Sequence, residues 1–206
     1  MKILLISAGT KTDGATERCV AEAEKVFKNA GITSEKFNLF SYEIFPCNGC
    51  GGCKVTGRCI HRDKALELCD MCAAFDGYMF FSPVHYGGAA GNMKAAMGRL
   101  FYSQKKNLEY KPAAAVTVSR RGGNVTALEE ITRFFGFANM PFVSGNYPGI
   151  VHGTSWEEAE ADEEGLQTVR SIAENTVWLL RCIDCAKDIG IYHPIPESKI
   201  KTSYIR

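Results

Sequence analysis

The sequence predicts an α/β fold in which a parallel sheet is covered by helices on both faces. Short apolar runs alternate with helical patterns from one end of the chain to the other, which is the order of βαβ units. Two of these runs, Lys2–Ser7 and Gly77–Ser82, have the apolar character expected for strands that are buried on both faces. With 206 residues, 46% of them hydrophobic and 23% charged, the whole chain, residues 1–206, is expected to fold as one domain.

The first half of the chain supplies three expected strands and two expected helices. Lys2–Ser7 is apolar along its whole length and forms the first strand. A helical stripe then covers Gly14–Asn29 and ends at a glycine, and Ile32–Leu39 follows as the second strand. Asp63 is placed to cap a helix that reaches Ala74, and Gly77–Ser82 is the third buried strand.

The second half completes a sheet of five strands. Ala113–Ser119 is rich in alanine and valine, and Met140–Ser144 is a short apolar run, so both are expected to be strands. Helical patterns cover three further segments, Asn92–Ser103, Val125–Phe137 and Asp162–Ile189. A polar tail at about 191–206 follows the last helix.

Composition excludes several classes of function. The net charge is +1, and lysine and arginine form no basic stripe, so nucleic-acid binding is not expected. No apolar run approaches the ~20 residues of a membrane helix, and the N-terminal run is too short for a signal peptide. The nine cysteines are therefore interpreted as reduced thiols or ligands, and the expected compartment is the cytoplasm.

A run of four cysteines lies in the loop 46–60, which we call the Cys loop. Cys47, Cys50, Cys53 and Cys59 have the spacing C-x2-C-x2-C-x5-C. Four thiolates from one short segment can wrap a small iron–sulfur cluster, and C-x2-C steps recur in such ligand runs. The interleaved glycines let the backbone fold tightly around an inorganic core. The Cys loop is therefore a candidate cluster site.

Two other interpretations of the Cys loop stay open. Zinc also accepts four thiolates, although structural zinc sites more often join two separated C-x2-C pairs. The loop can also be a glycine-rich turn whose reduced thiols hold no metal.

Ligands of parallel sheets bind beyond the carboxyl ends of the strands, which draws attention to three loops. The first, Ser7–Thr16, places free N–H groups, hydroxyls and Lys11 at the start of a helix, an arrangement that favours a phosphate. It matches neither G-x-G-x-x-G nor a Walker loop, so a dinucleotide on a Rossmann site or ATP is not expected. Helix capping alone also accounts for its composition.

The second loop, Ser82–Lys94, can hold a flat ring. Pro83 fixes the chain, the glycines permit close backbone approach, and His85 and Tyr86 offer aromatic surface to a flavin edge. The alternative is a rigid turn with two partly exposed aromatic residues.

The third loop, Ser119–Asn124, contains Arg120 and Arg121 beside a Gly-Gly turn. Two arginines in this place can stabilise an anionic reduced ring or the phosphate of a pyridine nucleotide. Solvated surface charges at a helix start explain the same pair.

These loops carry a resemblance to a known family. From residue 1 to about residue 190 the chain is similar to the flavodoxin-like NAD(P)H-dependent FMN reductases, and within them to the iron–sulfur flavoproteins. The motifs that carry the resemblance are S-P-V-H-Y-G-G-A-A-G-N-M-K at 82–94, C-N-G-C-G-G-C-K-V-T-G-R-C at 47–59 and D-E-E-G-L-Q-T-V-R at 162–170. The resemblance implies a flavodoxin-like three-layer sandwich, with a five-stranded parallel sheet in the order 2-1-3-4-5, and a homodimer or homotetramer.

The resemblance also implies an FMN site. In the family the second loop holds the isoalloxazine ring, and the first loop binds the FMN phosphate, usually with S-P-R-x-x-G-N-T. This chain reads G-T-K-T-D-G-A-T, so Gly9, Lys11 and Ala15 replace serine, arginine and asparagine, and Thr16 is retained. The candidate cofactor-binding residues are Gly9, Lys11, Ala15, Thr16, Ser82, Pro83, Val84, His85, Tyr86, Gly87, Ser119, Gly122 and Gly123. The four cysteines of the Cys loop match the family's compact ligand run position by position.

We therefore expect an FMN-dependent oxidoreductase that takes electrons from NAD(P)H or a protein donor and passes them on through a four-iron four-sulfur cluster. Because the flavin carries the chemistry, no protein acid or base is required, and His85, Tyr86 and Arg120 are the candidates for assisting it. Three alternatives stay open: a cluster-free NAD(P)H-dependent FMN or quinone reductase, a non-enzymatic flavodoxin-type electron carrier, and a zinc-stabilised binding module. The near-neutral charge counts against a carrier, because carriers of that family tend to be strongly acidic.

Two further C-x2-C pairs lie in helical patterns. Cys69 and Cys72 form one pair, and Cys182 and Cys185 form the other. Their neighbours are mostly leucine and isoleucine, so all four are expected to be buried as small hydrophobic residues.

Overall fold

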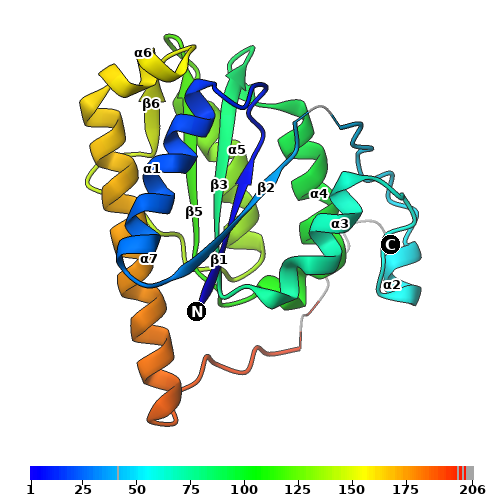
Figure 1. Ribbon diagram of the computed structural model, residues 1–206. Coiled ribbons are helices and arrows are strands. Elements are labelled where there is room, and N and C mark those ends of the chain that lie inside the picture. The colour runs from blue at the N-terminus through cyan, green and yellow to red at the C-terminus, as the bar shows by residue number, and fades with distance from the viewer. Residues whose placement is uncertain (41, 199, 201, 203–206) are drawn as a thin grey trace.

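The computed structural model describes residues 1–40, 42–198, 200 and 202. A central parallel sheet runs in the order β2-β1-β3-β5-β6 (Figure 1). Its strands are β1 (Lys2–Ser7), β2 (Thr33–Asn38), β3 (Gly77–His85), β5 (Ala113–Ser119) and β6 (Ile150–His152). The two-residue strand β4 (Gly88–Ala89) pairs antiparallel with the end of β3. The predicted fold class and the order of the parallel strands are confirmed.

Helices cover both faces of this sheet (Figure 1). One face carries α1 (Ala15–Asn29), α6 (Trp156–Ala161) and α7 (Glu163–Asp188). The other carries α3 (Lys64–Met71), α4 (Gly91–Leu108) and α5 (Asn124–Phe137). The short helix α2 (Gly52–Thr56) belongs to the Cys loop, and a 3₁₀ turn, Cys72–Ala74, follows α3.

The inner strands β1, β3 and β5 are mostly apolar because each contributes side chains to two cores. Leu4 and Ile6 of β1 lie in the core beneath α3, α4 and α5. Ile3 and Leu5 of the same strand lie in the core beneath α1 and α7. All four side chains are fully buried, which confirms the interpretation of Lys2–Ser7 as a strand covered on both faces.

The position of the fifth strand was predicted wrongly. The segment Met140–Ser144 contributes only an isolated parallel bridge between Phe142 and Ala113, and the edge strand is β6. The chain meets the start of β5 through hydrogen bonds at Pro141 and Val143, then leaves it and returns at Gly149. Pro141 has no N–H to extend the ladder, so the contact stays a single bridge.

Three expectations about helices also differ from the structure. The predicted helix Asn92–Ser103 is longer and reaches Leu108, with non-helical backbone at Gln104. The acidic run 157–164, for which the sequence predicts a solvated loop followed by a helix start, forms α6 in place of the loop, with Ser155 as its cap, and Asp162 then caps the start of α7 as expected. Cys182 and Cys185 are exposed, not buried, because the end of α7 extends past the sheet, whereas Cys69 and Cys72 are buried as predicted.

The chain beyond α7 forms no helix or strand over the described residues 191–198. Residues 199, 201 and 203–206 of the predicted polar tail lie outside the described residues. Among the helices that the structure describes, none is long and apolar enough to cross a membrane.

Candidate functional site

A cavity of about 240 Å³ opens at the carboxyl edge of the sheet, where the parallel strands end. All three predicted loops contribute to its wall. The predicted site residues that line it are Gly9, Lys11, Ala15, Thr16, Pro83, Val84, His85, Ser119 and Arg120. The structure therefore brings together the candidates for phosphate and ring binding around one opening.

One wall of this cavity was not predicted from the sequence. Gly153 and Thr154, directly after β6, also line it. They were missed because the fifth strand was placed at Met140–Ser144, and the signal that could have found them is the short apolar run that precedes Gly153.

The first loop leaves the N-terminus of α1 open to an anion. Gly14 is the N-cap residue, and because it has no side chain it makes no capping hydrogen bond to the first turn of α1. Free N–H groups at a helix start attract a negatively charged group through both hydrogen bonding and the helix dipole. Lys11 and Thr16 line the cavity at the same point.

A buried acid below this loop explains why residue 9 is glycine. A Cβ atom at Gly9 would lie 3.0 Å from Oε1 of Glu17 and 3.2 Å from Oγ of Ser7. The Ser7 hydroxyl donates to Glu17 and accepts the Gly9 N–H at 3.1 Å, and Nδ2 of Asn38 donates to Glu17 at 3.3 Å. Burial raises the pKa of Glu17, although the hydrogen bond from Ser7 acts in the opposite direction.

The second loop has the backbone shape of a tight hairpin. Tyr86 and Gly87 both have positive φ, 49° and 79°, and the Tyr86 side chain extends fully into solvent. Ser82 is buried and accepts the Ala90 N–H at 3.0 Å, so its hydroxyl holds the hairpin together. Ser82, Tyr86 and Gly87 therefore shape the loop and do not line the cavity.

The third loop packs directly against the second. Gly123 has φ of 91°, and a Cβ atom there would lie 2.7 Å from Cα of Gly87 and 2.9 Å from Cγ1 of Val84. Only glycine allows this approach. Ser119 donates to Asn124, whose Nδ2 donates to the Thr117 carbonyl at 3.1 Å, so the turn is fixed from below. Gly122 and Gly123 support the wall that Ser119 and Arg120 form.

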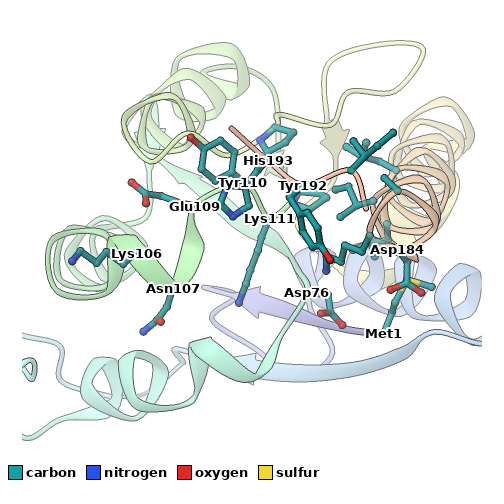
Figure 2. A pocket seen from close by; sticks show the side chains of 18 residues that line it. Met1, Asp76, Lys106, Asn107, Glu109, Tyr110, Lys111, Asp184, Tyr192 and His193 are labelled. Atoms are coloured by element: carbon teal, nitrogen blue, oxygen red, sulfur yellow. The ribbon is translucent and has the colours of Figure 1, made fainter. Parts of the chain in front are cut away.

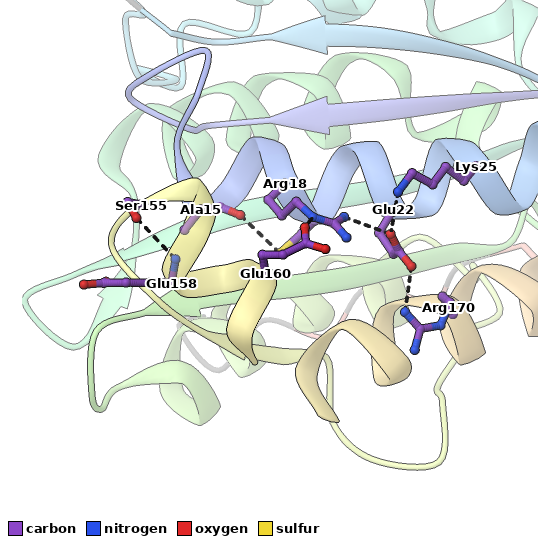
Figure 3. A network of polar contacts seen from close by, with 9 residues as sticks. Ala15, Arg18, Glu22, Lys25, Ser155, Glu158, Glu160 and Arg170 are labelled. Carbon is purple, nitrogen blue, oxygen red and sulfur yellow. Dashed lines mark hydrogen bonds and ion pairs between the residues drawn. The ribbon is translucent and has the colours of Figure 1, made fainter. Parts of the chain in front are cut away.

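A polar network holds the fourth wall in place (Figure 3). The buried Arg18 of α1 pairs with Glu22 at 2.8 Å and with Glu160 of α6, and Arg170 of α7 pairs with Glu22 at 2.6 Å. Burial acts to raise the pKa of Glu22, but the hydrogen bonds from Arg170 and Arg18 outweigh it and hold the pKa at about 2. The network ties α6, and with it the segment that carries Thr154, to α1.

The Cys loop lies away from the sheet, beside α3 and α4 (Figure 1). Cys47 and Cys50 are exposed, and Cys53 and Cys59 are half-buried. Glycines in the left-handed conformation flank α2 at both ends, Gly51 with φ of 73° and Gly57 with φ of 75°. In the part of the chain that the structure describes, no three Cys, His, Asp or Glu side chains gather closely enough to hold a metal ion.

Two observations nevertheless fit an inorganic group at the Cys loop. The donor set is four free thiols, the ligands that iron–sulfur clusters use. Among the described residues, two buried side-chain polar atoms have no hydrogen-bond partner, Nε2 of His61 and Nε of Arg99. Arg99 donates to the carbonyls of Phe45 and His61, which flank the Cys loop, so both unsatisfied atoms belong to residues at its ends.

Two cysteines outside the Cys loop, Cys69 and Cys72, are buried. Burial raises the pKa of Cys69 to about 11 and that of Cys72 to about 12. Both thiols are therefore less readily ionised than an exposed thiol, and the thiolate is the form that ligates metals.

A larger cavity, of about 590 Å³, lies at the opposite edge of the sheet (Figure 2). Its wall includes the end of α4, the end of α7 and the first residues of the tail, where His193 stacks on Tyr110 with ring centroids 4.2 Å apart. None of the predicted site residues lines it. The candidate site is the smaller cavity, because ligands of open parallel sheets bind at the carboxyl edge.

Comparison with known proteins identifies the family. The sequence profile of the NADPH-dependent FMN reductase family matches residues 1–155. The chain belongs to this family. It is therefore an FMN-dependent NAD(P)H oxidoreductase, and the family assignment expected from the three loop motifs is confirmed.

Two curated relatives and one solved structure of this FMN reductase family member extend the comparison. An iron–sulfur flavoprotein from Methanocaldococcus jannaschii is 30% identical over 191 residues, 89% of this chain and 99% of the relative. One from Methanosarcina thermophila is 29% identical over 192 residues, 91% of this chain and 100% of the relative. The solved structure of RosB with a bound 8-demethyl-8-formylriboflavin-5′-phosphate intermediate has a TM-score of 0.72 at 14% identity, covering 100% of this chain and 94% of RosB.

Proposed function

We propose that this FMN reductase family member takes electrons from NADH or NADPH at an FMN held on the carboxyl edge of the sheet. The observation that carries this proposal is the meeting of the three predicted loops around one cavity, with the open N-terminus of α1 at one side. Bound FMN would accept a hydride from NAD(P)H, leaving NAD(P)⁺, and could release the two electrons singly.

Different residues of the cavity would bind different parts of FMN. The N–H groups at the start of α1, with Lys11 and Thr16, would bind the phosphate. Pro83, Val84 and His85 would lie against the ring. Arg120 would offset negative charge on the reduced ring or bind the phosphate of the nicotinamide donor.

We further propose that the electrons leave through a four-iron four-sulfur cluster held by Cys47, Cys50, Cys53 and Cys59. The free thiols, the two unsatisfied buried polar atoms nearby and the resemblance to iron–sulfur flavoproteins over nearly the whole chain support this proposal. The electron acceptor would be a small molecule or a protein, and a homodimer or homotetramer in the cytoplasm remains our prediction.

A cluster-free FMN or quinone reductase is the second candidate. It is favoured by one observation: the four thiols of the Cys loop do not gather in the described structure.

An absorption spectrum of anaerobically purified protein, with iron, sulfide and flavin assayed on the same sample, tests both proposals. Flavin bands with a broad brown shoulder, and iron and sulfide near four each per chain, are expected. Flavin bands without iron or sulfide, even after reconstitution with iron and sulfide, would leave the cluster-free reductase. A protein that binds no flavin would overturn the proposed FMN site. Steady oxidation of NADH or NADPH by the flavin-loaded protein alone checks the electron donor.

A further inference from the structure

Arg99 connects the two ends of the Cys loop. It lies on α4 and is only 1% exposed. Its Nη1 atom donates to the Phe45 carbonyl at 3.4 Å and to the Asp63 carboxylate, and its Nη2 atom donates to the His61 carbonyl at 2.9 Å. One guanidinium therefore contacts the chain just before the first loop cysteine and just after the last.

The third nitrogen of this guanidinium, Nε, is unsatisfied. Nε of Arg99 is buried and has no hydrogen-bond partner among the described residues. Leaving a buried donor unpaired destabilises the folded state, more so when the group is charged, and such atoms are therefore rare in folded proteins. This unpaired N–H group lies beside the Cys loop, and its presence there requires an explanation.

Cys59, the last cysteine of the Cys loop, lies two residues before the His61 carbonyl that this guanidinium contacts. Burial acts to lower the pKa of Arg99, but the hydrogen bond to Asp63 and the nearby Cys59 sulfur outweigh it and raise the pKa. Arg99 is therefore a fixed cation beside a candidate cluster ligand. N–H donors to ligand sulfurs orient the ligands and stabilise the more negative, reduced state of a cluster.

We propose that Arg99 is the positioning residue of the cluster site: it closes the Cys loop through Phe45, His61 and Asp63, and its Nε–H donates to the sulfur of Cys59. This inference rests on the proposed cluster. It assigns to one buried side chain both the retention of iron and the tuning of the reduction potential.

The test compares Arg99→Lys with Arg62→Lys in reconstituted protein. Lysine keeps the charge beside Asp63 but removes Nε and the fork that reaches the two carbonyls. We expect Arg99→Lys to lose iron to a chelator about 10- to 100-fold faster than the wild type and to have a more negative cluster potential. Arg62 is exposed, so Arg62→Lys should change neither the rate of iron loss nor the cluster potential. Flavin content and thermal unfolding show whether the variant is folded.

A second measurement needs no variant. The reduced wild-type protein is prepared with isotope-labelled arginine, and electron–nuclear double resonance detects arginine nitrogen coupled to the cluster. We expect a coupled arginine nitrogen. A loaded wild-type protein without this coupling, or an Arg99→Lys variant with unchanged iron loss and potential, would overturn the inference and leave the cluster in place. A wild-type protein that never holds iron and sulfide would instead overturn the proposed cluster together with the inference.

Discussion

The carboxyl edge of the sheet and the Cys loop are organised in different ways. At the carboxyl edge each wall of the cavity follows a strand whose register is set by its neighbours, and Gly123 packs against Gly87. The Cys loop pairs with no strand, contains one short helix between two left-handed glycines, and is attached to the fold at its ends by Arg99. One site is shaped by the fold, and the other has its ends fixed while few apolar contacts hold its centre.

The two regions differ in how many apolar side chains they bury. The residues before the cavity belong to strands that are buried on both faces, so their positions are determined by packing. Around the Cys loop, Phe45, Val55 and Ile60 are exposed, so few apolar contacts order it. In such segments the binding energy of a metal group supplies the ordering that the core does not. The comparison leads to four predictions.

The largest effect is expected at the Cys loop. Replacing Cys50 by alanine removes one of four ligands, so bound iron should fall to background, while flavin content stays unchanged because the FMN site lies at the other region. Iron, sulfide and flavin assays on the purified variant check this. The matched control is Cys185→Ala, an exposed cysteine outside the loop, which should keep full iron. Stoichiometric iron in the Cys50 variant would refute the ligand assignment.

The second prediction concerns the contact between the two loops of the flavin site. Gly123→Ala places a Cβ atom 2.7 Å from the Gly87 backbone at φ of 91°, so the wall must shift. Strain of about 1–3 kcal/mol corresponds to a loss of FMN affinity of about 10- to 100-fold. Gly122→Ala is the control, because its Cβ would meet nothing within 4 Å and its φ is not positive. A fluorescence titration with FMN measures both, and equal affinities would show that the ring lies elsewhere.

The third prediction concerns the network behind the cavity. Glu22→Gln removes the charge that Arg18 and Arg170 share, and should lower the free energy of unfolding by about 2 kcal/mol at neutral pH. The pKa of Glu22 in the folded protein, about 2, lies below its ordinary value of 4.5. The stabilisation is therefore complete above pH 4.5 and is lost as the pH falls toward 2.

Urea unfolding at several pH values checks this third prediction. The difference between the wild type and Glu22→Gln should shrink as the pH falls below 4.5. The exposed Glu174 of α7 provides the control, because Glu174→Gln should change stability little at any pH. A difference that is the same at every pH would show that the charge of Glu22 contributes nothing.

The smallest effect is expected at Glu17, below the phosphate loop. Its raised pKa keeps more of the carboxyl neutral, and ionisation as the pH rises would place a negative charge beside the phosphate. Among its charged neighbours, Lys36 on β2 favours ionisation and Glu24 on α1 opposes it, but these two pair with each other at 2.6 Å. We expect FMN affinity to weaken a few-fold as the pH rises through the pKa of Glu17.

Riboflavin, which lacks the phosphate, is the matched ligand for this fourth prediction. Its affinity should not show the Glu17-dependent weakening, and Glu17→Gln should remove that weakening for FMN. Fluorescence titrations of both ligands at several pH values measure the effect. An identical pH dependence of FMN binding in the wild type and in Glu17→Gln would show that the carboxyl does not act on the phosphate.

The sequence by itself determined the fold class and the place of the candidate site. Continuous apolar runs such as Lys2–Ser7 indicate strands buried on both faces, because helices must cover both sides of a parallel sheet. Local signals also located the helix that Asp63 caps and the loops after the strands. The four loop cysteines are close in sequence, so their possible function as ligands was visible from spacing alone.

Only the tertiary structure decided which distant residues meet. The edge strand β6 has only three residues, which is too short for a recognisable strand pattern in the sequence. Its pairing with β5 identifies it as a strand. Arg99 lies 54 positions from Phe45 and 36 from Asp63, and Arg170 lies 148 positions from Glu22. Periodicity and spacing report local preference, whereas these contacts depend on how the layers pack. For the same reason, the lack of a side chain at Gly9 is explained only by the position of Glu17 in the folded protein.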